Sequence, residues 1–202
     1  MDSSILCALA AQRGPLNTFS LDYEGNEQYF KGYAYQTTRD NDYIDAMVQR
    51  YQFHHQPLLI TQRECEELLE TAMVGRDGPG MADVDSSLLW MYRKVKEQTD
   101  SVLTGECSDE LFGGYPWFYR SDLVDLKSFP WLQSLPQRVK LLRAPINELD
   151  YEGAMRAAYW ATVQRAPKDP FDSEQDQRAK TMTYLTVHWF MQTLIQRQEA
   201  MA

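Results

Sequence analysis

Over its first 117 residues the chain alternates short apolar runs with segments of helical period. Such alternation predicts an α/β layer in which parallel strands are joined by helices. The expected strands are residues 18–21, 57–60 and 101–104, and the expected helices are residues 4–11, 42–51, 64–73 and 87–96.

From residue 121 onward there is no strand pattern, and prolines interrupt segments of helical period. Proline cannot continue the interior of a helix, so we expect several short helices there. Residues 172–201 contain no proline or glycine and predict one long helix or two. The chain therefore divides into an α/β part, residues 1–120, and a helical part, residues 121–202.

The composition is that of a globular protein, with 44% hydrophobic and 24% charged residues among 202. The formal net charge of −9 argues against broad binding to nucleic acid or to anionic membranes. The longest apolar run, residues 5–11, is far shorter than the roughly 18–20 residues that cross a bilayer. Cys7, Cys65 and Cys107 are odd in number and widely spaced, so we expect no disulfide framework, no zinc site and a cytoplasmic location.

The densest group of acidic residues and glycines spans residues 103–115 and follows the third expected strand. Ligands of open α/β sheets bind beyond the carboxyl ends of strands. Gly105 would let the backbone approach a ligand, while Glu106 and Asp109 could hold Mg²⁺ or move a proton. A solvated acidic loop that caps a helix is the alternative interpretation.

Two other segments could bind anions or substrate, and each has a plain structural alternative. Asp2-Ser3-Ser4 opens the first expected helix, where free amides could bind phosphate or where an ordinary N-cap could form. Residues 76–87 are rich in glycine and aspartate and predict a loop, in which Asp85 or Ser86 would cap the next helix.

Several of these segments resemble the glutamine-hydrolysing asparagine synthetases. Residues 104–118 are similar to the family signature SGE-x-[SA]-DE-[LV]-FGGYPWF, and Asp2-Ser3-Ser4 is similar to the end of the pyrophosphate loop, SGG-x-DSS. Residues 18–23, 79–87 and 189–194 also resemble the family. The resemblance implies an adenine nucleotide α hydrolase-like fold, with a doubly wound, mostly parallel sheet whose first strand is missing, followed by a helical extension.

The resemblance also implies a mechanism, in which aspartate attacks the α-phosphate of ATP to give β-aspartyl-AMP and ammonia then displaces AMP. By position, Asp2 and Asp109 would hold Mg²⁺, and Glu106 would accept a proton as ammonia attacks. The nucleotide and its pyrophosphate would contact Ser3, Ser4, Leu21, Thr104 and Gly105. The aspartate substrate would lie against Gly80, Met81, Asp83, Asp85 and Ser86.

Against the family pattern, the sequence lacks the first strand, the SGG of the pyrophosphate loop, a later lysine and a glutaminase domain. We therefore expect a synthase-domain fragment, cut at both ends and impaired in activity, that uses ammonia or a glutaminase domain in trans and that could form a homodimer. Two alternatives stay open. One is a related amide-forming ATP-pyrophosphatase such as a β-lactam synthetase, and the other is a non-catalytic remnant or nucleotide-binding module.

Overall fold

The computed structural model describes residues 1–32, 38–124 and 126–202, without the side chains of Asp83, Ser121 and Val124. The chain forms two compact units. The first contains residues 1–106 and 194–202, and the second contains residues 107–193. The sequence predicts a boundary after residue 120 between two parts of one domain, and this boundary stays a prediction.

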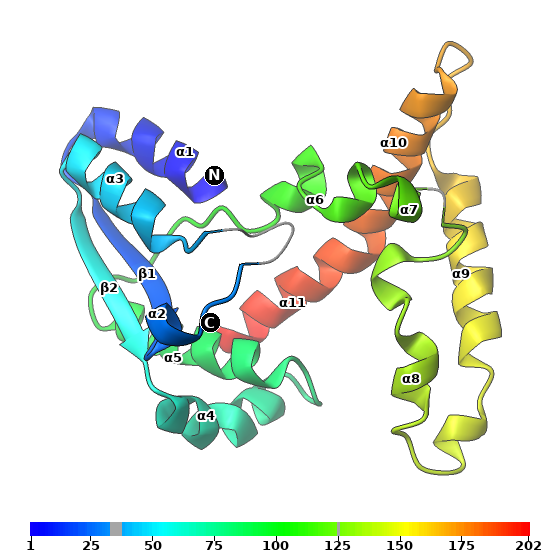
Figure 1. Ribbon diagram of the computed structural model, residues 1–202, viewed down its shortest axis with the longest axis horizontal. Helices are drawn as coiled ribbons and strands as arrows, with labels where there is room; N and C mark the ends of the chain where they lie inside the picture. Colours follow the sequence, from blue (N-terminus) through cyan, green and yellow to red (C-terminus); the bar gives the residue numbers. More distant parts are fainter. Residues whose placement is uncertain (33–37, 125) are drawn as a thin grey trace. The chain divides into compact units, whose positions relative to one another are not determined.

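The sheet of the first unit consists of two parallel strands, β1 (Asn17–Tyr23) and β2 (His54–Ile60), which Figure 1 shows side by side. Thr18 is paired with His55 and Leu21 with Leu58. Parallel neighbours need a long crossover, and the crossover here contains α3 (Asn41–Tyr51). The α/β class, the strands predicted at residues 18–21 and 57–60 and their parallel direction are thus confirmed.

The third expected strand, residues 101–104, does not form, and in the described residues the sheet is two strands wide. A strand is defined by hydrogen bonds to a neighbouring strand, and no described segment provides such a ladder to residues 101–104. Leu103 is 88% exposed, so burial does not fix this segment either. The sequence pattern wrongly predicted a strand here, because a pattern does not reveal whether a pairing partner is present.

Four helices of the first unit form where the sequence predicts helices, although α5 starts earlier than expected, and the short elements α2 and η1 were not predicted. Thr61 and Glu64 form a capping box before α4, with Glu64 N donating to Thr61 Oγ1 (3.2 Å) and Thr61 N to the Glu64 carboxylate (2.9 Å). α5 begins five residues before the expected position, because Asp85 lies inside the helix and reaches back to Met81 instead of capping it. The bounds are α1 (Asp2–Ala10), η1 (Ala11–Arg13), α2 (Asn26–Tyr29), α4 (Gln62–Gly75) and α5 (Ala82–Lys96).

The core of the first unit lies around β2 and the helices that follow it. α5 contacts β2, and α4 packs against α5. Ile60 is fully buried, and Ala72 of α4, Val95 of α5 and Met201 of α11 are nearly so. α1 has no buried residue, so its position depends on few apolar contacts.

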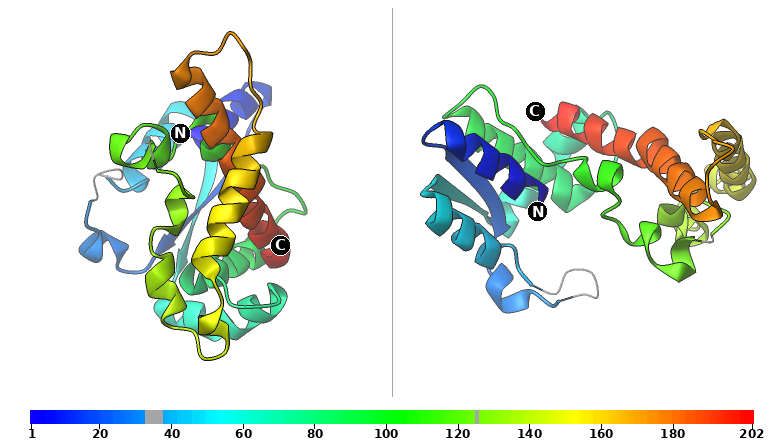
Figure 2. Two further views of the ribbon diagram at one scale, coloured as in Figure 1. Left: turned by 90° about the vertical axis from the view of Figure 1, so that its right-hand side faces the viewer. Right: turned by 90° about the horizontal axis from the view of Figure 1, so that it is seen from above.

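The second unit is helical in its described residues, as expected. Its core contains Phe129, Tyr159 and Leu185, and the buried Trp117 donates its indole N–H to Thr186 Oγ1 (3.2 Å). The last helical run is continuous through a π-helical turn, and its final residues, from Leu194, belong to the first unit (Figures 1 and 2). The elements of the second unit are α6 (Ser108–Phe112), η2 (Pro116–Phe118), α7 (Ser121–Val124), η3 (Pro130–Leu132), α8 (Leu135–Val139), η4 (Ile146–Glu148), α9 (Tyr151–Arg165), α10 (Glu174–Leu185), η5 (Thr186–Phe190) and the first residues of α11 (Met191–Met201).

None of the helices in the described part of the chain is both long and apolar enough to span a bilayer.

Candidate functional site

The turn Thr104-Gly105-Glu106 contacts the first turn of α1, which lies about a hundred positions earlier in the chain. Gly105 N donates a hydrogen bond to Ser3 Oγ at 3.3 Å. Glu106 N donates to Thr104 Oγ1 at 3.1 Å, so the threonine hydroxyl stabilises the turn from within. Three of the predicted site residues are therefore placed beside the predicted phosphate-binding helix start.

Glycine is required at position 105 because the two backbones approach closely. A Cβ on Gly105 would lie 2.5 Å from Ser3 N and 2.8 Å from Ser3 Oγ. Contacts of this length do not occur for real Cβ atoms, and the nearest atom belongs to the backbone of a helix rather than to a flexible side-chain tip. The turn can approach α1 this closely only without a side chain.

The start of α1 has no side-chain cap. Met1 is the N-cap residue, and the first helical bond runs from Ile5 N to Met1 O at 3.1 Å. The amides of Asp2, Ser3 and Ser4 precede that bond and have no acceptor within the helix. The ordinary N-cap proposed from the sequence is thus not formed, and Ser3 Oγ accepts from Gly105 instead. Such free amides, together with the helix dipole, suit an anion.

Glu106 forms an ion pair with Arg197 of α11, with Arg197 Nη2 3.1 Å from Glu106 Oε1. The side chains are 31% and 13% exposed respectively. Burial raises the pKa of Tyr92 on α5, and the Glu106 charge raises it further while Arg197 opposes the shift. Sequence reasoning identified Glu106 but missed Arg197 and Tyr92, because no local pattern marks residues that meet only through the fold.

Asp109, the second predicted ligand of Mg²⁺, belongs to the other compact unit. It lies in the first turn of α6, where its carbonyl oxygen accepts from Gly113 N and Gly114 N, both at 3.0 Å. No group of three potential metal ligands occurs among the described residues. A cation shared by Asp2 and Asp109 stays a prediction.

The segment predicted to bind aspartate forms the turn before α5 and its first helical turns. Gly80 and Met81 lie in the turn; Asp83, whose side chain is outside the described part, and Asp85 and Ser86 lie in α5. Asp85 is 3% exposed, and its Oδ2 accepts from Met81 N at 3.1 Å. Its Oδ1 lies 3.5 Å from Arg76 Nη1.

Ser86 is fully buried and donates its hydroxyl to Ala82 O at 2.9 Å. Asp85 and Ser86 thus stabilise their own loop and helix, while Met81 is 59% exposed. The role of this segment in binding aspartate stays a prediction.

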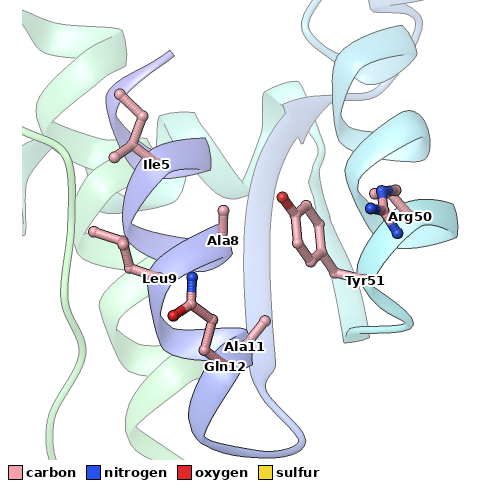
Figure 3. Close-up of a pocket in the computed structure, with 7 residues that line it drawn as sticks. All are labelled: Ile5, Ala8, Leu9, Ala11, Gln12, Arg50 and Tyr51. Carbon is pink, nitrogen blue, oxygen red and sulfur yellow. The ribbon is translucent and has the colours of Figure 1, made fainter.

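Leu21, the remaining predicted nucleotide contact, is a partly buried residue near the carboxyl end of β1. A separate hollow of about 420 Å³ lies between α1, η1 and the end of α3, and Figure 3 shows the apolar side chains of α1 on one side and Tyr51 on the other. Its lining residues are Ile5, Ala8, Leu9, Ala11, Gln12, Arg50 and Tyr51. None of the predicted site residues lines it.

Comparison with known proteins gives two findings. The protein-family model described as asparagine synthase matches residues 1–202. The chain is 37% identical over 209 aligned positions to "Asparagine synthetase [glutamine-hydrolyzing] 3" of Bacillus subtilis (strain 168). The alignment covers 100% of this chain and 34% of that protein, so the chain spans about a third of the length of the curated relative.

Proposed function

Because the chain belongs to the asparagine synthase family, we propose that it performs the synthase half of asparagine formation. ATP activates the side-chain carboxylate of aspartate as β-aspartyl-AMP, with release of pyrophosphate. Ammonia then displaces AMP and gives asparagine. The sheet is proposed to belong to the doubly wound, adenine nucleotide α hydrolase-like type.

The contact between Gly105 and Ser3 is the observation that carries this proposal. The turn that carries Glu106 contacts the uncapped start of α1 through this bond, so free helix amides, which suit an anion, and a carboxylate occur on the same compact unit. The chemistry needs both, because the pyrophosphate is the leaving group and the attacking nitrogen must lose a proton.

In this proposal the amides and hydroxyls of Ser3 and Ser4 bind the pyrophosphate oxygens. Gly105 lets the backbone of the turn approach the nucleotide closely, and Thr104 fixes that turn. Leu21 provides an apolar contact to the nucleotide. A bound Mg²⁺ would neutralise part of the phosphate charge. Asp2 and Asp109 are the proposed ligands, and a site of one or two carboxylates plus substrate phosphates is typical of this ion.

Glu106 is proposed to accept the proton that nitrogen loses as the C–N bond forms.

The aspartate substrate is proposed to lie against the turn at Gly80 and Met81, with Asp85 and Ser86 supporting that turn through the contacts described above. A glutaminase domain acting in trans, a homodimer and a cytoplasmic location remain further parts of the proposal.

The test is to supply the chain with ATP, Mg²⁺, aspartate and ammonium, and to measure pyrophosphate and asparagine. We expect both products, and we expect Glu106→Gln to reduce asparagine formation by about 10²- to 10⁴-fold, the usual contribution of a general base. ATP binding without either product would instead identify a non-catalytic nucleotide-binding module. Pyrophosphate release that does not depend on aspartate would point to another amide-forming enzyme, such as a β-lactam synthetase.

A further inference from the structure

Three elements of the first compact unit converge on Glu106. They are the turn that carries it, α11 with Arg197, and α5 with Tyr92, which lies within electrostatic reach of both charges. Arg197 donates to Oε1 of the carboxylate, and none of the described residues hydrogen-bonds Oε2. One oxygen of the carboxylate is held while the other stays available as an acceptor.

The Arg197 side chain is costly to place here. It is 13% exposed, and its Nε atom is buried without a hydrogen-bond partner among the described residues. Removing a guanidinium from water costs free energy, and one contact to a carboxylate that is itself 31% exposed offsets that cost poorly. Arrangements that work against stability are typical of functional sites.

We propose that Arg197 is a positioning residue that fixes the carboxylate of Glu106 for proton transfer, an inference that rests on the proposed function. As the ammonia nitrogen forms its bond to the β-carbonyl carbon, one N–H proton passes to Glu106 Oε2. The C–O bond to AMP breaks, and its electron pair leaves on the phosphate oxygen. A general base must lie within hydrogen-bond reach of the proton it removes, and the planar guanidinium restricts the carboxylate better than a flexible cation does.

The experiment compares wild type with Arg197→Gln, Arg197→Lys and the control Arg93→Gln, which removes an exposed arginine from α5. Two rates are measured: aspartate-dependent pyrophosphate formation without ammonia, and asparagine formation with saturating ammonium. We expect Arg197→Gln to lower kcat for asparagine about 10- to 100-fold, as for a misplaced catalytic group. Pyrophosphate formation and the KM for ATP should stay within about twofold of wild type, and Arg197→Lys should restore part of the lost rate.

A KM for ATP that rises with a matching loss of pyrophosphate formation would overturn the proposal, because Arg197 would then act on the nucleotide. Unchanged asparagine formation in Arg197→Gln would also overturn it. A wild-type chain that forms no asparagine refutes the proposed function itself, and this inference with it. Urea unfolding of each variant identifies a fold defect, and equal loss of both rates in the folded Arg197→Lys chain assigns Arg197 a purely structural role.

Discussion

Replacing Gly105 by alanine tests whether the turn and the start of α1 form one site. The new Cβ would lie 2.5 Å from Ser3 N, 2.8 Å from Ser3 Oγ and 3.0 Å from the Asp2 carbonyl carbon, where ordinary contacts begin at 3.4 Å. The turn must therefore retreat by about 1 Å, and such overpacking costs about 1–3 kcal/mol. The retreat also stretches the 3.3 Å hydrogen bond to Ser3 Oγ, worth about 1 kcal/mol.

Alanine also reduces the conformational entropy of the unfolded chain, which offsets about 0.4–1 kcal/mol of this cost. We therefore expect the free energy of unfolding to fall by about 1–3 kcal/mol. In urea this lowers the unfolding midpoint by about 1 M. Gly78→Ala is the matched control, because a Cβ there meets nothing within 4 Å and its φ is not in the left-handed region. Equal midpoints and equal ATP affinities for the two variants would refute the proposed contact.

Two other predictions concern stability. Burial lowers the pKa of His55 below its usual 6.5, and the charge of Asp45 opposes this shift. The unfolded chain therefore binds more protons than the folded chain as the pH falls from about 7 to about 5, and the free energy of unfolding declines. His55→Gln should flatten this pH dependence in urea unfolding, and an unchanged pH profile would contradict the prediction. Thr186→Val leaves the indole N–H of Trp117 buried without its acceptor and should cost about 1–3 kcal/mol. The partly buried Thr183 provides the control, and an equal loss in Thr183→Val would show that the hydrogen bond is unimportant.

The sequence predicted those elements whose causes are local or repeated. Residues 18–21 and 57–60 form strands because each has the other as a partner. The capping box at Thr61 and Glu64 is visible as a threonine followed three residues later by a glutamate. Residues 101–104 have the same apolar pattern without a pairing partner, so the pattern predicted a strand that does not form.

In the candidate site, too, residues marked by a local pattern were predicted, whereas contacts made through the fold were not. The residue pattern and the family resemblance both indicated Ser3, Gly105 and Glu106, and the structure brings the first two into contact. Arg197 could not be predicted, because it meets Glu106 from 91 positions away through the packing of α11. The start of α5 was misplaced because aspartate is common in caps, whereas Asp85 bonds Met81 from within the helix.

Backbone amide shifts of the ¹⁵N-labelled chain during titration with ATP and Mg²⁺ report where the nucleotide binds. If the uncapped start of α1 and the neighbouring turn bind the nucleotide, the amides of Ser3, Ser4 and Gly105 shift together with one dissociation constant. Ala8 and Tyr51, which line the separate hollow, should keep their positions. Shifts confined to that hollow, or no shifts at millimolar ATP, would refute nucleotide binding at the start of α1.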